Sequence, residues 1–258
     1  SREYEQQRLG VLAGIVSGDY DIVVAGIEAA VQFTLPPSVL SSRTLILKAG
    51  VALPEKDLPA VFAAAGYERC EQVEGAGQYS VRGGIIDIFP AGCPSPVRIE
   101  LWGDTVDTIW YYDVLSQRRT EPLKEISISP AAEIMPDRPD ELASNIEELA
   151  EGLRGKNAAA AREILMADCE LLRGGGHPAS YDKYIPLIYK KPATLFDYSD
   201  GALLFVSERT RVRERLRTTE WQLGEDIKSL LAEGQLCRGL TEYMMDSVGV
   251  QSELESRG

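Results

Sequence analysis

The chain has 258 residues, of which 44% are hydrophobic, and its formal net charge is −13. That length allows one large domain or two to three small ones. It contains no run of about 18 apolar residues, so we expect no membrane-spanning helix. Free DNA-binding modules are usually basic, and phosphates repel an acidic chain that lacks a basic patch. The charge therefore favours a protein partner, or a fragment of a protein whose nucleic-acid surface lies elsewhere.

The cysteine and histidine content argues against a metal site. The single histidine, His177, lies in a glycine-rich loop, and the four cysteines are far apart without CxxC spacing. This pattern fits neither a metal-ligand cluster nor a disulfide framework. We therefore expect a reduced, cytoplasmic protein without a metal. The polar start is no signal peptide and lacks Met, so we also expect a longer parent protein.

The first 48 residues show an α/β pattern. Helices are predicted over 3–17, where apolar residues share one face, and over 28–34. Apolar runs predict strands over 21–25 and 44–48. Helix, strand, helix and strand in this order indicate an α/β layer.

Residues 49–130 are predicted to form a mostly antiparallel sheet with one helix. The helix is expected over 58–65, just before Gly66. Gly103-Asp104 joins two alternating runs by only two residues, which predicts a tight hairpin. Strands are predicted at 68–73, 78–82, 85–89, 97–102, 106–112 and 126–129.

Residues 131–258 are predicted to return to α/β structure. Helices are expected over 141–153, 158–172 and 211–231, and strands over 185–189 and 203–206. Strands between helices again indicate an α/β layer.

The run 97–102 alternates between apolar and other side chains. Its apolar set predicts a core face, so Arg98, Glu100 and Trp102 are expected on the outer face. Arginine and tryptophan together on an exposed sheet face are typical of protein contacts. If strand 78–82 pairs nearby, Arg82 approaches the same surface. The alternative is that another domain of the same protein covers Trp102.

The run LLFVSE at 203–208 resembles the strand that carries an acidic pair for Mg²⁺ in nucleotide hydrolases. Here the pair is Ser207 and Glu208, so the metal-binding aspartate is missing. The chain also has no GxxxxGK[ST] loop. We therefore expect no catalytic residues and no ATPase activity.

Two charged clusters are interpreted as surface charge. The nearby carboxylates of Asp87, Glu100, Asp104 and Asp107 are expected on the surface rather than in acid–base catalysis. The run 209–217 carries five arginines, diluted by neighbouring glutamates and scattered around a helix. A solvated, ion-paired helix is the first interpretation, and contact with DNA or another partner is the alternative.

Longer runs resemble a known family. YSVRGGIIDIFPAG and PVRIELWGDTVDTIWYYDVLSQRRTEPL resemble the transcription-repair coupling factor (Mfd) family and, more weakly, the excision-repair protein UvrB. The resemblance implies an α/β fold with two incomplete, degenerate RecA-like halves that flank a mostly antiparallel α+β module. Residues 1–48 would be part of domain 1A, 49–130 the UvrA-binding domain 2, and 131–258 domain 1B.

The resemblance also implies a function and a site. The chain would be an inactive adaptor that recruits UvrA in nucleotide excision repair, with Arg82, Arg98 and Trp102 as contacts. The family usually has Phe at the position of Trp102. ATP, Mg²⁺, DNA and RNA polymerase would engage other parts of the parent protein, an ATP-dependent DNA translocase. The alternatives are a UvrB-like ATP-dependent helicase core or a DNA-binding module.

Overall fold

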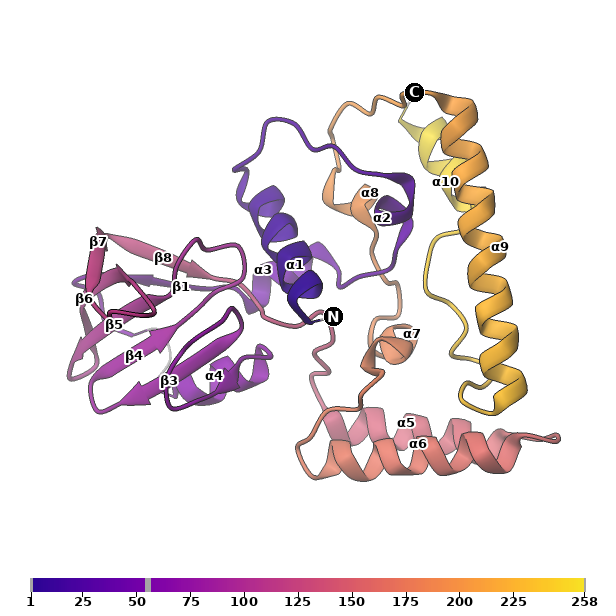
Figure 1. Ribbon diagram of the computed structural model, residues 1–258, viewed down its shortest axis with the longest axis horizontal. Coiled ribbons are helices and arrows are strands. Elements are labelled where there is room, and N and C mark those ends of the chain that lie inside the picture. Colours follow the sequence, from indigo (N-terminus) through magenta and orange to yellow (C-terminus); the bar gives the residue numbers. More distant parts are fainter. Residues whose placement is uncertain (1, 54–56, 258) are drawn as a thin grey trace. The chain divides into compact units, whose positions relative to one another are not determined.

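A computed structural model describes residues 2–53 and 57–257 of the chain. It divides into two compact units, each built from two stretches of sequence. The first unit comprises Ser1–Asp21 and Pro37–Met135, and the second comprises Ile22–Pro36 and Pro136–Gly258. Each unit brings together segments that are far apart in the chain (Figure 1). The three-part division expected from the sequence stays a prediction.

The first unit contains two sheets and three helices among its described residues. Its helices are α1 (Arg2–Ser17), α3 (Pro37–Arg43) and α4 (Leu58–Ala64). A two-stranded sheet pairs β1 (Leu45–Lys48) with β8 (Glu125–Ile128) in antiparallel register. The larger sheet has the order β2-β3-β4-β5-β6-β7. Its strands are β2 (Glu68–Arg69), β3 (Gln78–Arg82), β4 (Ile85–Ile88), β5 (Val97–Trp102), β6 (Thr105–Tyr112) and β7 (Arg119–Leu123).

The larger sheet is a meander apart from its first strand. β2 runs parallel to β3, and the remaining neighbours pair antiparallel. Gly83 and Gly103 have φ angles of 60° and 61°, which suit the tight two-residue turns after β3 and β5. The hairpin predicted at Gly103-Asp104 is therefore confirmed. β7 was not expected, because its sequence RTEPL is polar and contains a proline.

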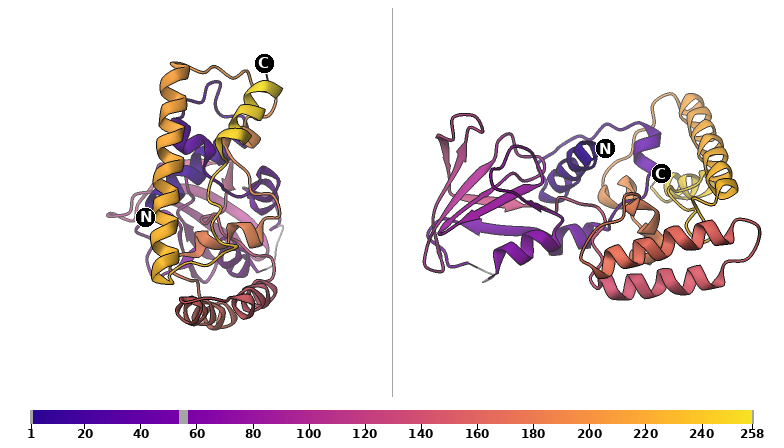
Figure 2. Two further views of the ribbon diagram at one scale, coloured as in Figure 1. Left: turned by 90° about the vertical axis from the view of Figure 1, so that its right-hand side faces the viewer. Right: turned by 60° about the horizontal axis from the view of Figure 1, so that its bottom comes forward.

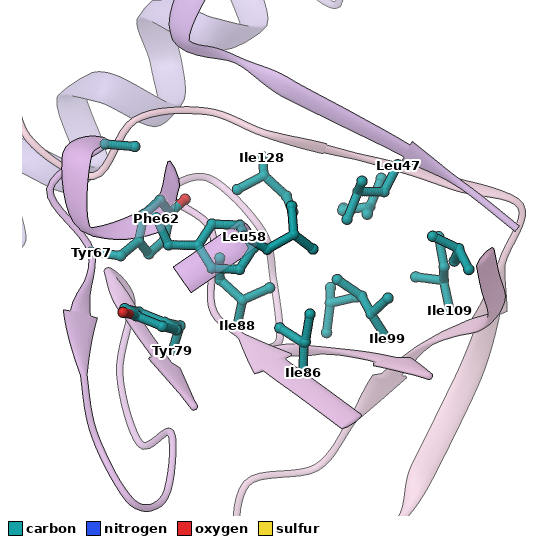
Figure 3. Packing of buried hydrophobic residues seen from close by; sticks show 14 of the residues in the cluster. Leu47, Leu58, Phe62, Tyr67, Tyr79, Ile86, Ile88, Ile99, Ile109 and Ile128 are labelled. Atoms are coloured by element: carbon teal, nitrogen blue, oxygen red, sulfur yellow. The ribbon is translucent and has the colours of Figure 1, made fainter. Parts of the chain in front are cut away.

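A hydrophobic core lies between α4 and the sheets of the first unit (Figure 3). The Asp57 carboxylate caps α4 by accepting a hydrogen bond from the Ala60 amide at 3.1 Å. Phe62 of α4 then packs edge-on against Tyr67 and Tyr79, with ring centroids 5.9 and 5.3 Å away. Inward-pointing residues of the strands fill the rest, among them Leu47, Ile86, Ile88, Val97, Ile99 and Ile109.

The second unit is mainly helical. Helices α5 (Pro139–Gly152) and α6 (Ala158–Arg173) lie side by side and bury a core against residues near Tyr184 and Leu236 (Figures 1 and 2). The long helix α9 (Arg209–Glu233) has Leu216 as its one buried residue. The shorter helices are α2 (Ile27–Val31), η1 (Tyr181–Tyr184), α7 (Ile185–Ile188), α8 (Leu195–Tyr198) and α10 (Ser247–Ser256).

Three predicted strands are wrong. Residues 21–25 and 203–206 form no strand, and 185–189 begin with helix α7. An apolar run forms a strand only where a partner strand pairs with it, and Pro186 suits the first turn of a helix. Pairing among the second unit's described residues is limited to the isolated bridges Gln32↔Met244 and Thr34↔Ala193.

The fold class is therefore confirmed only in its coarser form. The chain is a mixed α/β protein with antiparallel and mixed sheets, as expected. The RecA-like halves are not confirmed. Among the described helices, none is long and apolar enough to cross a membrane.

Candidate protein-docking face

The candidate site lies on the outer face of the six-stranded sheet. Strand register places Asp87 of β4 directly opposite Arg98 of β5, and Arg98 opposite Trp110 of β6. In the neighbouring row, Arg82 of β3 lies opposite Ile85. We call the outer face of β3 to β6 around these residues the docking face. Its opposite side carries the core residues Ile86, Val97 and Ile99.

Arg98 is held tightly within the docking face. Its Nε and Nη2 donate to the two Asp87 carboxylate oxygens at 2.7 and 2.9 Å. Nη1 and Nη2 also donate to the backbone and side-chain oxygens of Gln117 at 3.3 and 3.0 Å. The hydrogen bond with Asp87 raises the pKa of Arg98. With 15% of its side chain exposed, Arg98 points to the predicted face and is largely enclosed there.

Tyr112 explains why Arg98 is enclosed. The guanidinium carbon of Arg98 lies 4.5 Å from the centre of the Tyr112 ring, in a cation–π contact. The ring is fully buried, and burial raises the pKa of its hydroxyl. Gln117 adopts a left-handed backbone conformation, with φ at 57°, and its two oxygens accept hydrogen bonds from the guanidinium.

Arg82 reaches the same carboxylate but stays accessible. Its Nη2 donates to Oδ2 of Asp87 at 2.6 Å, and 52% of its side chain is exposed. A hollow of about 650 Å³ lies beside it. Ser80 lines this hollow with a buried hydroxyl that has no hydrogen-bond partner. The hollow is lined by Arg69, Cys70, Glu71, Ser80, Val81 and Arg82.

Trp102 is the most exposed aromatic side chain of the docking face. It ends β5, just before the hairpin turn, and 83% of it is accessible. Ile85 adds an apolar side chain that is 37% exposed. The structure thus joins Arg82 and Arg98 through one carboxylate and places Trp102 on the same strand as Arg98.

Asp87 is the residue of this face that the sequence interpretation missed. It was expected as surface charge, yet it is 1% exposed and bonded to both arginines. A signal was present, because Asp87 interrupts the apolar run IIDI on the face that the strand turns away from its core. Glu100 fits the surface interpretation better, since it pairs with Arg119 and accepts a hydrogen bond from Thr108 at 2.9 Å.

Ser207 and Glu208 belong to the second unit and form no acidic pair on a strand. Both are exposed, and Glu208 adopts a left-handed conformation with φ at 51° just before α9. Its carboxylate pairs with Arg211 at 3.1 Å. No group of three or more metal-ligating side chains occurs in 2–53 and 57–257.

The arginines of α9 divide into two sets. Arg211 and Arg215 form ion pairs with Glu208 and Glu28, as the ion-paired interpretation expects. Arg209, Arg213 and Arg217 recur every four residues and are exposed, so they follow one side of the helix. Arg211 and Arg215 lie on another side, so the five arginines occupy more than one face of the helix, as the sequence indicated. Contact between these arginines and DNA stays a prediction.

Comparison with known proteins matches the segment that carries the docking face to a described domain. Residues 45–134 match the model of the UvrB interaction domain. The chain is 37% identical over 246 residues to a transcription-repair-coupling factor of Bacillus subtilis, covering 92% of this chain and 21% of that protein. The corresponding protein of Haemophilus influenzae is 29% identical, covering 80% of this chain and 17% of that protein.

A weaker similarity is to UvrABC system protein B of Thermosipho africanus, which is 29% identical over 79% of this chain and 33% of that protein. The chain spans about a fifth of the length of the first two relatives. All strands that carry the docking face lie within the matched residues. The chain thus resembles the part of transcription-repair coupling factors that contains the UvrB interaction domain.

Proposed function

We propose that this chain is the UvrA-docking module of a transcription-repair coupling factor in nucleotide excision repair. The observation that carries the proposal is the docking face itself. It combines an exposed tryptophan, Trp102, with two arginines that converge on one buried carboxylate. It lies inside the segment that matches the UvrB interaction domain.

The docking face has the features of a protein contact. A large aromatic side chain near the centre of an interface supplies apolar area, and arginine supplies directed hydrogen bonds. Arg82 and Arg98 together carry two positive charges against the single negative charge of Asp87. Glu100 of the same face pairs with Arg119, so the cluster around Asp87 keeps one positive charge on a chain whose net charge is −13. That polarity suits an acidic surface on UvrA.

The proposal assigns no reaction to the chain itself. Ser207 stands where a nucleotide hydrolase carries its metal-binding aspartate, which supports an adaptor without ATP or Mg²⁺. The parent protein would be an ATP-dependent DNA translocase that acts on stalled RNA polymerase. Its motor would lie outside the fifth that this chain spans.

The degenerate RecA-like halves also belong to this proposal. Residues 22–24 and 203–205 are apolar and lie in neither a helix nor a strand, with Val24 92% exposed and Phe205 87% exposed. Apolar side chains this exposed on neither helix nor strand suit segments that pair elsewhere. We assign them as strands of a RecA-like sheet that further residues of the parent protein complete.

The decisive experiment measures binding of the chain to purified UvrA by titration calorimetry. Trp102→Ala should weaken binding by about 2 kcal/mol, about thirtyfold in Kd, because it removes the apolar anchor. Trp102 is exposed, so the melting temperature should stay within about 2 °C of the wild-type value.

Trp221→Ala is the matched control, since Trp221 is also exposed, at 64%, but lies on α9 in the second unit. It should leave UvrA binding unchanged. Absence of wild-type binding, or equal losses for the two variants, would exclude the proposed docking face.

A further inference from the structure

The two arginines of the docking face differ in how many hydrogen-bond donors they leave for a partner. A guanidinium has five N–H donors. Arg98 makes four hydrogen bonds inside the protein, to Asp87 and Gln117. Arg82 makes one, to Asp87. Most of the donor capacity that the face offers to a partner therefore belongs to Arg82.

Asp87 connects the two side chains. Its Oδ2 accepts from both Arg82 and Arg98, and its Oδ1 accepts from Arg98 alone. The Asp87 side chain is 2% exposed, and both guanidiniums donate hydrogen bonds that hold its carboxylate in place. Arg98 is itself fixed by Gln117 and by the Tyr112 ring.

We propose that Asp87 is a positioning residue of the docking face, which orients Arg82 toward a carboxylate of the partner. Arg98 acts through Asp87, by fixing the carboxylate, and does not itself contact the partner. This inference rests on the proposed UvrA docking, and it assigns different roles to two arginines that the family resemblance treats alike.

The physical reason is the cost of ordering a long side chain. A free arginine at a surface loses rotamer freedom when a partner binds it, which weakens binding. A charged hydrogen bond of 2.6 Å to a buried carboxylate restrains Arg82 before the partner arrives. The remaining N–H groups present a planar fork that matches a carboxylate on the partner.

The test is a double-mutant cycle in UvrA affinity with Arg82→Ala and Arg98→Lys. Arg82→Ala should weaken binding about tenfold, since it removes the contacting group. Arg98→Lys keeps the charge but loses the two parallel N–H donors that hold the Asp87 carboxylate. It should therefore weaken binding about fivefold in the wild-type background. In the Arg82→Ala background it should cost less than twofold, because the group that it positions is gone.

If the double variant loses affinity by the product of the two single-variant losses, the inference is overturned, since Arg98 would then contact the partner independently. A purely structural effect of Arg98→Lys would also persist without Arg82, so the cycle separates positioning from general destabilisation. Arg173→Lys is the matched control, because Arg173 donates two hydrogen bonds to the Glu147 carboxylate in the second unit. This substitution should leave the affinity for UvrA unchanged.

Melting curves establish that each variant is folded at the assay temperature. If Arg98→Lys is not folded there, Asp87→Asn replaces it in the cycle and should show the same dependence on Arg82. Trp102→Ala distinguishes the two levels of proposal. If Trp102→Ala loses binding and the two losses in the cycle multiply, the positioning role is refuted while the docking face stands. Absence of wild-type binding would refute the docking face.

Discussion

At the scale of single residues, the surroundings decide what identical side chains can do. Arg82 and Arg98 share one acceptor, yet 52% of one side chain and 15% of the other is exposed. Arg98 lies on β5, between β4 and β6, where Tyr112 and Gln117 enclose it. Arg82 ends β3 at a hairpin turn, where fewer neighbours reach it. Alternation along a strand predicts which face of the sheet a residue lies on. It does not predict whether neighbouring side chains bury that residue.

A second buried carboxylate gives a residue-scale prediction. In the second unit, Asp168 is 8% exposed, pairs with Lys183 at 2.7 Å and accepts a hydrogen bond from Tyr184 at 2.6 Å. Asp168→Asn leaves the buried ammonium without a counter-charge, which should cost about 3–5 kcal/mol of unfolding free energy. Urea denaturation monitored by circular dichroism measures this loss.

Glu147→Gln is the control for the Asp168 prediction. It removes an ion pair with Arg173, whose side chain is 44% exposed, between helices α5 and α6. Water screens an exposed pair, so the denaturation midpoint should shift much less. Equal shifts for the two variants would show that burial does not decide the strength of these pairs.

At the scale of elements, the strands of the larger sheet could be predicted well from the sequence. The bounds of β3 and β5 agree with the predicted 78–82 and 97–102. Period-two alternation and glycine turns are local signals, so they survive without knowledge of the fold. β2 has two residues instead of the six predicted, because its pairing with β3 covers only Glu68 and Arg69.

Close packing of α1 gives an element-scale prediction. A Cβ on Gly10 would lie 2.7 Å from backbone atoms of Gly92, so α1 approaches that loop only because residue 10 is glycine. Gly10→Ala should therefore cost about 1–3 kcal/mol of unfolding free energy, although alanine is the better helix former. Thermal and urea denaturation measure the change.

Gly224→Ala is the matched substitution in α9. A Cβ there has open space within 4 Å, so only the gain in helix propensity remains. It should stabilise the second unit by about 0.5–1 kcal/mol. If both variants stabilise, the contact between Gly10 and Gly92 does not constrain α1.

At the scale of the whole molecule, each unit is discontinuous in sequence. Residues 22–36 leave the first unit to join the second, and the chain then returns at Pro37. Helix α2 contacts α8 and α9 within the second unit, which explains why this short stretch belongs there. Such long-range pairing leaves no periodic signal in the stretch itself.

The exposed segments 22–24 and 203–205 give a whole-molecule prediction. In this chain their amides have no sheet partner, so they should exchange with deuterium within seconds. In the longer parent protein proposed above, strand pairing should slow the same amides by about a hundredfold or more. Exchange followed by mass spectrometry compares the two.

The strand amides around Ile99, which pair with β4 and β6 in the first unit, are the internal control and should be protected in both proteins. Equally fast exchange of 22–24 and 203–205 in both would rule out the assignment of these segments as RecA-like strands.

The sequence by itself determined the sheet that carries the docking face, the outward position of Trp102 and the main helices α1, α5, α6 and α9. These features follow from local periodicity, turn chemistry and capping. Only the tertiary structure decided that Asp87 is buried between two arginines and that 22–24 and 203–205 remain unpaired. The burial of Asp87 and the lack of pairing in the two segments depend on which residues, distant in sequence, pack next to them. A pattern along one segment does not contain that information.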